Sequence, residues 1–275
     1  MRLFLLSKLT ILLLTTLLAA SLLLCFALFK QGKQFYRRLN ATQLDPIGLS
    51  FFPVTPASIL DKQKDAKRLV FFGDSRIEQW TQPKIAGYEI LNRGIGGQTS
   101  TQILMRYDAH VRPLAPDILL IQAGINDLKT IALFPEQRDK ILADLQENLA
   151  ALTQRAVDQG ITVLLTTIFP VGKVPLARKL FWSKDVEAAI VKVNTFISSL
   201  QAKNILVFDA YSILVGEDGK IRPQYSRDLL HLNQEGYKVL NRELGQFIAN
   251  LSVDDTAPHR MNTSSTRPNA QNITY

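Results

Sequence analysis

The stretch LVFFGDSRIEQW, residues 69–80, joins four apolar residues directly to the triplet Gly73-Asp74-Ser75. Short apolar runs of branched and aromatic residues without polar alternation are typical of strands that are buried on both faces. Gly73 lets the chain turn sharply, and we expect the following RIEQW to be helical. The stretch therefore predicts a strand, a tight turn and a helix, with the Ser75 hydroxyl at the carboxyl end of the strand.

Four further apolar runs have the same character and extend this pattern along the chain. They are EILNRG (89–94), DILLIQAG (117–124), ITVLLTTIFP (161–170) and ILVFDA (205–210). Segments with helical spacing lie between them, such as the one between Pro135 and Gly160, where leucine or isoleucine recurs every three or four residues. We predict an α/β fold, a three-layer α/β/α sandwich around a five-stranded parallel, flavodoxin-like sheet, plus an N-terminal transmembrane helix.

Residues 9–29 form an apolar run without any charge. Such a run is long enough to cross a bilayer, which takes about 20 residues, whereas a secretory signal usually has only about 7 to 15 apolar residues. We expect an uncleaved anchor at 1–29, a stalk at 30–66, a globular domain at 67–251 and a disordered tail at 252–275. The alternatives are a cleaved signal peptide and a lipoprotein signal ending at Cys25, against which Leu24 is bulky.

The formal charge of +8 is concentrated at the N-terminus, where the first forty residues carry six basic residues and no acidic one. The remainder holds 26 basic and 24 acidic residues, so it lacks the basic footprint of a nucleic-acid-binding protein. Four of the basic residues follow the apolar run and two precede it, and this count places the domain in the cytoplasm. Our expectation is nevertheless a single-pass bacterial inner-membrane protein with its domain outside the cytoplasm.

A serine hydroxyl needs a base before it can act as a nucleophile. Of the three histidines in the chain, His231 is the best candidate, since His110 has no evident partner and the third lies in the expected tail. Asp228 precedes His231 by three residues. One turn at this spacing can bring the carboxylate to one ring nitrogen while the other nitrogen points outward.

Acyl transfer also needs hydrogen-bond donors for an oxyanion. Gly97 in NRGIGGQTS (92–100) can offer a backbone N–H, and Asn126 in AGIND (123–127) can offer a side-chain amide. Each motif has a structural alternative, because glycines form turns and because Asp-Ser, Asn-Asp and Asp-x-x-His sequences also occur in ordinary helix caps and capped turns. The segments nevertheless all meet at one edge of the predicted sheet.

The four blocks FFGDSR, NRGIGGQTS, AGIND and DLLHLNQEGY stand in an order that resembles the SGNH hydrolases, also called the GDSL esterase/lipase family. The resemblance covers about residues 68–250. Their form is most similar to the branch with the platelet-activating-factor acetylhydrolase catalytic subunits and bacterial acyl esterases. The resemblance implies Ser75 as nucleophile, His231 as base and Asp228 as its orienting carboxylate, with an oxyanion hole of Ser75, Gly97 and Asn126.

Two residues depart from the common family pattern. Arg76 replaces leucine after the serine, and Gln98 stands where an acidic residue often follows the second glycine. We expect both to bind substrate, together with Trp182 in the segment VGKVPLARKLFWSKD (171–185), which we expect to form a wall or lid. The basic and apolar residues of this segment suit an amphiphilic or anionic substrate, and a solvated start of an amphipathic helix is the alternative.

The predicted function is a membrane-anchored serine esterase that hydrolyses a carboxylic ester, acyl or acetyl, through an acyl-serine intermediate. This mechanism needs no organic cofactor and no metal. The expected partners are a small-molecule, lipid or glycan ester and a membrane contacted through residues 9–29, without nucleic acid. Two alternatives use the same sequence: a membrane-tethered O-acyltransferase or deacetylase that acts on a glycan, and a non-catalytic binding domain.

Overall fold

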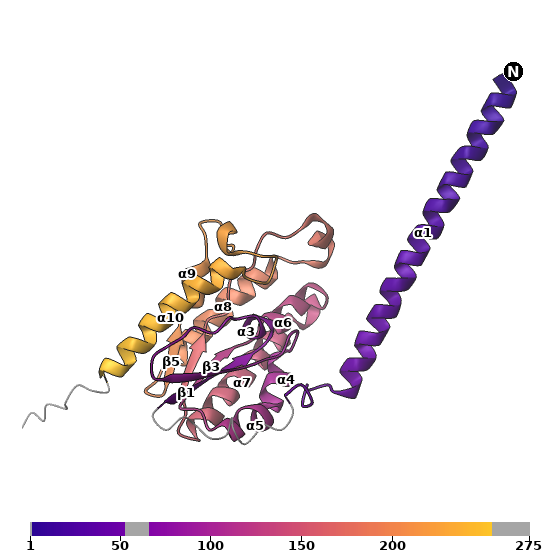
Figure 1. The fold of residues 1–275 in the computed structure, drawn as a ribbon. Helices are drawn as coiled ribbons and strands as arrows, with labels where there is room; N and C mark the ends of the chain where they lie inside the picture. The colour runs from indigo at the N-terminus through magenta and orange to yellow at the C-terminus, as the bar shows by residue number, and fades with distance from the viewer. Residues whose placement is uncertain (1, 53–65, 255–275) are drawn as a thin grey trace, which may run out of the picture.

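The computed structural model of the chain describes residues 2–52 and 66–254, and its domain is built around one sheet (Figure 1). The strands are β1 (Lys67–Gly73), β2 (Tyr88–Gly94), β3 (Ile118–Gln122), β4 (Thr162–Thr166) and β5 (Ile205–Phe208). They are all parallel, in the order β2-β1-β3-β4-β5. This is the flavodoxin-like order, so the predicted five-stranded parallel sheet is confirmed.

Helices cover both faces of the sheet. The longest are α7 (Arg138–Val157), α8 (Asp185–Ser199) and α10 (Gln234–Asp254). The short helices are α3 (Ser75–Glu78), α4 (Ser100–Met105), α5 (Tyr107–His110), α6 (Ile125–Leu128) and α9 (Ala210–Leu214), and the 3₁₀ turns are η1 (Arg112–Leu114), η2 (Lys129–Ala132), η3 (Pro135–Gln137), η4 (Leu176–Phe181) and η5 (Pro223–Tyr225). The arrangement is the predicted three-layer sandwich.

Strand β1 shows why a continuous apolar run was needed. Val70 and Phe72 pack into the cluster that includes α7 and α8, whereas Leu69 and Phe71 pack into the cluster that includes α10. All four side chains are fully buried. Because successive side chains of a strand point to opposite faces, a strand covered by helices on both sides cannot alternate apolar with polar residues.

The helical spacing between Pro135 and Gly160 corresponds to α7, with one adjustment at its start. Pro135 begins the 3₁₀ turn η3, and the α-helix proper starts at Arg138. Leu145, Leu149 and Leu152 face the core, as their spacing indicates. The segment therefore supplies one of the helices that cover the sheet.

The N-terminal apolar run belongs to a single helix, α1 (Arg2–Leu44), which continues through the first part of the expected stalk. Within it, Ser7–Leu44 contains a window with a mean hydropathy of 2.6 that no part of the domain covers. The helix is long and apolar enough to cross a membrane, and a signal sequence near an N-terminus has the same properties. Residues 53–65 lie outside the described residues, as do residues 255–275 of the expected disordered tail, whereas its first residues, 252–254, belong to helix α10 (Gln234–Asp254).

After α1 the chain returns to the domain. The Asp45 carboxylate accepts hydrogen bonds from the N–H groups of Gly48 (2.8 Å) and Leu49 (2.8 Å) and so closes a turn. The Phe52 ring then packs edge-on against His110, with 5.2 Å between ring centroids, and the Arg93 guanidinium lies 4.7 Å from its centroid. Residues 45–52 thus form a strap that fastens the helix to the domain.

Candidate active site

Ser75 is the first residue of α3 and lies directly beyond the carboxyl end of β1. Gly73 passes so close to β3 that a Cβ atom there would lie 1.9 Å from the Gln122 carbonyl oxygen. Asp74 caps the helix by accepting a hydrogen bond from the Arg76 N–H (2.8 Å). The capping role considered from the sequence is therefore real, and it fixes the position of the serine.

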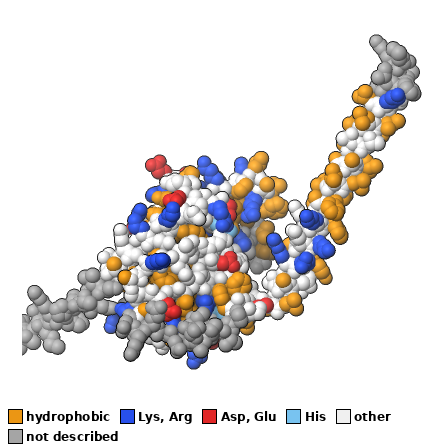
Figure 2. Space-filling view, in the orientation of Figure 1, with side chains coloured by type: hydrophobic (Ala, Val, Ile, Leu, Met, Phe, Trp, Pro, Cys, Tyr) orange, Lys and Arg blue, Asp and Glu red, His pale blue; other side chains and the backbone are white. Residues whose placement is uncertain are grey.

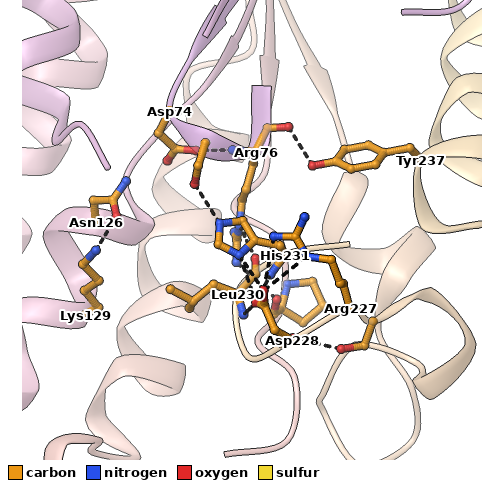
Figure 3. A network of polar contacts seen from close by, with 12 residues as sticks. Asp74, Arg76, Asn126, Lys129, Arg227, Asp228, Leu230, His231 and Tyr237 are labelled. Carbon is orange, nitrogen blue, oxygen red and sulfur yellow. Dashed lines mark hydrogen bonds and ion pairs between the residues drawn. The ribbon is translucent and has the colours of Figure 1, made fainter. Parts of the chain in front are cut away.

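The structure brings the predicted triad residues together across 156 positions of sequence (Figure 3). The Oγ atom of Ser75 lies 3.0 Å from Nε2 of His231. On the other side of the ring, Nδ1 lies 2.9 Å from Oδ1 and 3.0 Å from Oδ2 of Asp228. A hydroxyl, an imidazole and a carboxylate in line at these distances can pass a proton from serine to histidine.

A short turn holds the carboxylate and the imidazole in place. Oδ1 of Asp228 accepts hydrogen bonds from the backbone N–H groups of Leu230 and His231, both at 2.9 Å. The Arg227 N–H donates to the His231 carbonyl oxygen (3.0 Å), which closes the turn from the other side. The carboxylate thus caps its own turn and orients the ring, so the capped-turn interpretation and the triad interpretation describe the same structure.

The electrostatics of the pair keep the imidazole neutral and the carboxylate charged. Burial alone would raise the pKa of Asp228, but hydrogen bonds from the Leu230 N–H and from His231 outweigh it and hold that pKa at about 2. Partial burial lowers the pKa of His231, and Asp228 opposes this shift. At neutral pH the histidine is therefore unprotonated at the nitrogen that faces Ser75, as a general base must be.

The two candidate oxyanion segments lie against each other. The Asn126 side chain, on α6, donates one amide hydrogen to the Gln98 carbonyl oxygen (2.9 Å), and Gly97 immediately precedes that residue. Gly97 adopts the left-handed conformation (φ 78°), and a Cβ there would meet no atom within 4 Å. The Asn126 amide retains a second hydrogen, and the surface beside Gly97 is open.

Two residues of this region were not anticipated from the sequence. Nζ of Lys129 donates a hydrogen bond to Oδ1 of Asn126 (2.6 Å). This bond holds the amide oxygen on the lysine side, so the NH₂ group faces the Gln98 carbonyl oxygen. The Asp127 carboxylate accepts hydrogen bonds from the Ser100 N–H (2.9 Å) and hydroxyl (2.7 Å), and so ties the two segments together. The i, i+3 spacing of Asn126 and Lys129 on a helix is the signal that could have found this pair.

Arg76 does not line the site, so its expected role in substrate binding is corrected. Its side chain is fully buried. The guanidinium donates to the backbone carbonyl oxygens of Leu230 (3.0 Å) and Phe169 (3.2 Å) and stacks on the Phe169 ring at 5.0 Å. Because the guanidinium is hydrogen-bonded inside the protein, it is not available to substrate. Its bond to the Leu230 carbonyl oxygen supports the turn that holds His231.

The expected role of Gln98 in substrate binding is corrected for the same reason, because the residue is only 5% exposed and both polar ends of its side chain are hydrogen-bonded. Its Nε2 donates to the Ile47 carbonyl oxygen of the strap (2.6 Å), and its Oε1 accepts from Nε of Arg106 (2.5 Å). Trp182 is half-buried and packs against the core, and its contact with substrate stays a prediction. Two of the three expected substrate-binding residues are therefore structural.

Comparison with known proteins places the chain in a family. Residues 58–239 match the GDSL-like lipase/acylhydrolase family. A GDSL-like lipase from Bacteroides thetaiotaomicron is 28% identical, with a TM-score of 0.61 over 74% of this chain and 98% of that one. A structure from Streptococcus pneumonia whose description names platelet activating factor has a TM-score of 0.61 over 79% and 98% of the chains, and at 20% identity this likeness concerns the fold.

A curated relative, the Bacillus subtilis (strain 168) lipoprotein YqeF, is 27% identical over 139 residues. The match covers 44% of this chain and spans only 56% of that protein. The family match, in contrast, includes the residues around Ser75 and His231 whose geometry is described above. The chain belongs to the GDSL-like lipase/acylhydrolase family and is an ester hydrolase.

Proposed function

We propose that the chain is a membrane-anchored serine esterase that hydrolyses a carboxylic ester through an acyl-serine intermediate. The observation that carries this proposal is the line of contacts from Ser75 to His231 (3.0 Å) and from His231 to Asp228 (2.9 Å). A serine becomes nucleophilic when a neutral imidazole at this distance takes its proton, and a carboxylate on the far nitrogen stabilises the imidazolium.

In the first half of the cycle, Oγ of Ser75 attacks the ester carbonyl carbon while Nε2 of His231 accepts the hydroxyl proton. The tetrahedral intermediate collapses, the C–O bond to the alcohol breaks, and the imidazolium gives its proton to the departing oxygen. The acyl group stays on Ser75. In the second half, His231 takes a proton from water, the resulting hydroxyl adds to the acyl carbon, and the acid leaves as the serine regains its proton.

Three groups are proposed to hold the negative oxygen of each tetrahedral intermediate. They are the backbone N–H groups of Ser75 and Gly97 and the free side-chain N–H of Asn126. The Asn126 amide is supported at both ends, by Lys129 (2.6 Å) and by the Gln98 carbonyl oxygen (2.9 Å), so it needs no rearrangement during the reaction. Preorganised donors of this kind lower the barrier by roughly 2.7 to 4 kcal/mol each.

Membrane attachment through α1 is supported by its length and hydropathy and by a relative that is a lipoprotein, a membrane-attached class of protein. We further propose that the domain lies outside the cytoplasm of a bacterium. A reporter fused after residue 251, active only in one compartment, tests this orientation. Activity of the cytoplasmic reporter would contradict it.

Hydrolysis assays with the full-length protein in detergent test the enzymatic proposal. The substrates are p-nitrophenyl esters of short and long acyl chains and acetylated sugars, and the variant is Ser75→Ala. Ser199→Ala is the matched control, because that serine is exposed on α8. We expect hydrolysis of at least one ester class by the wild type and the control and none by Ser75→Ala. Equal rates for all three proteins would contradict the proposal.

A further inference from the structure

The η4 segment exposes large apolar side chains to solvent next to the candidate site. Leu176 is 81% exposed, Leu180 is 89% exposed and Phe181 is 65% exposed. These three are close in sequence, and they are not needed by the core, which η4 does not enter. Contiguous exposed apolar residues of this kind mark a contact surface rather than a stable solvent-facing surface.

The charges around η4 all have one sign. Between residues 170 and 184 the chain carries four basic residues and no acidic one. All four side chains are exposed: Lys173, Arg178, Lys179 and Lys184. Apolar and basic side chains gather in the same way at the upper right of the domain in Figure 2. Basic residues mixed with exposed leucine and phenylalanine are the composition of segments that lie in the interface of an anionic bilayer.

This segment leaves the sheet beside the catalytic residues. Gly172, at its start, is so close to the histidine turn that a Cβ there would lie 2.7 Å from the Asp228 carbonyl oxygen. Burial lowers the pKa of Lys129, and the positive charge of Arg178 lowers it further, which puts that charge near the lysine that supports Asn126. The η4 segment therefore borders the site on both the histidine side and the oxyanion side.

The position of η4 relative to α1 also fits a membrane contact. Figure 1 shows the loop around residue 175 projecting from the upper right of the domain, on the side where the apolar part of α1 rises. The helix continues for residues 30–44 beyond the apolar run. At 1.5 Å per residue this length is about 22 Å, and the strap then returns the chain to the domain. The apolar part of α1 and the exposed apolar residues of η4 therefore lie on the same side of the domain.

We propose that the segment 173–184 is a second membrane contact, which rests on the surface of the anionic bilayer in which α1 is anchored. Leu176, Leu180 and Phe181 enter the interfacial region, and the basic residues face lipid headgroups. This proposal depends on one part of the proposed function, namely that α1 spans the membrane. The contact brings the carboxyl edge of the sheet to the lipid, so an ester carried by a membrane lipid can reach Ser75 without leaving the surface.

The test uses the full-length chain in lipid nanodiscs of phosphatidylcholine, with or without phosphatidylglycerol. Cys25 is the only cysteine, so Cys25→Ser gives a background into which Leu180→Cys is introduced and labelled with the polarity-sensitive fluorophore NBD. Lys203→Cys is the matched control, because Lys203 is exposed at the opposite edge of the sheet, just before β5. In anionic discs we expect the Leu180→Cys emission to shift to the blue and to be quenched by doxyl-labelled lipid.

The Lys203→Cys label should show neither change. If both labels report water in anionic discs, the segment does not contact the bilayer and the proposal is overturned. If the Leu180→Cys emission shifts to the blue but is not quenched by doxyl-labelled lipid, the segment closes on the protein instead, and the proposal is overturned as well. The readout does not require catalysis. Labelling of Ser75 by a fluorophosphonate, measured on the same samples, separates failure of the membrane contact from failure of the esterase proposal.

Neutralising the basic residues tests the headgroup contact. Arg178→Gln and Lys179→Gln, in the Leu180→Cys background, should each weaken the membrane contact about fivefold in anionic discs. Neither variant should alter the signal in phosphatidylcholine discs. An unchanged signal in anionic discs would contradict the choice of an anionic partner. Circular dichroism spectra that match the parent's show that the variants remain folded.

Discussion

The Nε atom of Arg76 donates a hydrogen bond to the Leu230 carbonyl oxygen at 3.0 Å, which joins the residue after the candidate nucleophile to the residue before the candidate base. The guanidinium is fully buried and also bonds to the Phe169 carbonyl oxygen. The Tyr237 hydroxyl, on α10, donates to the Arg76 carbonyl oxygen (2.9 Å). This residue of α3 thus connects the segment after β4, the histidine turn and α10, and the alignment of Ser75 with His231 depends on it.

Arg76→Leu should therefore lower both stability and activity. The variant leaves the Asp74 carboxylate buried without the cation that most lowers its pKa, and it leaves two carbonyl oxygens without this donor. The expected loss in the free energy of unfolding is roughly 3 to 5 kcal/mol. Urea denaturation and kcat/KM for an ester measure the two effects. The control is Arg242→Leu, an exposed arginine on α10, which should change stability by less than about 1 kcal/mol. Equal stability of the two variants would refute the bracing role of Arg76.

The pH dependence of kcat/KM should report His231. Only the neutral imidazole can accept the serine proton, so activity falls as pH drops through the pKa of His231. Partial burial lowers this pKa from the ordinary value of 6.5. The acid limb of the profile should therefore have its midpoint below 6.5. A midpoint above 6.5 would mean that Asp228 raises the pKa of His231 by more than burial lowers it, or that another group controls the rate.

Asn126→Ala should reduce kcat by a factor of roughly 10² to 10³ with little change in KM, because it removes a donor that acts mainly in the transition state. Steady-state kinetics with a soluble ester measure both constants. Asn148→Ala is the control, since that amide bonds only to hydroxyl groups of α4 among the described hydrogen bonds. A loss confined to KM would show that Asn126 binds the ground state instead.

Asp74→Asn should change how stability depends on pH. Burial, opposed mainly by Arg76, raises the pKa of Asp74 from 3.8 to about 6. Between these values the folded chain holds this proton more than the unfolded chain does, so the carboxyl group makes the free energy of unfolding fall as pH rises from about 4 to about 6. Asparagine can still cap α3 but does not titrate. Denaturation of both proteins across this range should give diverging curves, and parallel curves would contradict the shift.

The sheet and the triad could be predicted from sequence because their signals are local. An unbroken apolar run such as residues 69–72 indicates a strand buried on both faces, and parallel strands bring their carboxyl ends to one edge. Ser75, Gly97 and Asn126 each follow such a run, and Asp228 precedes His231 by one turn. Each of these placements depends on a few neighbouring residues and on the chain order of the strands.

The roles of Arg76 and Gln98 could not be predicted because their partners are distant in sequence. The Arg76 guanidinium bonds to Leu230, 154 residues away, and the Gln98 amide bonds to Ile47, 51 residues away. A charged or polar residue next to a nucleophile is normally expected at the surface, and only the folded backbone supplies the carbonyl oxygens that satisfy it in the interior. The contact between Lys129 and Asn126 differs, because these residues are three positions apart and their spacing could have indicated it.

The most direct test of the account is the site of covalent modification by a fluorophosphonate probe. The folded full-length protein is treated with the probe, and the modified peptide is identified by mass spectrometry. We expect one adduct, on Ser75, that is absent in Ser75→Ala and strongly reduced in His231→Ala. An adduct on another serine, or no adduct on protein that is shown by circular dichroism to be folded, would contradict it.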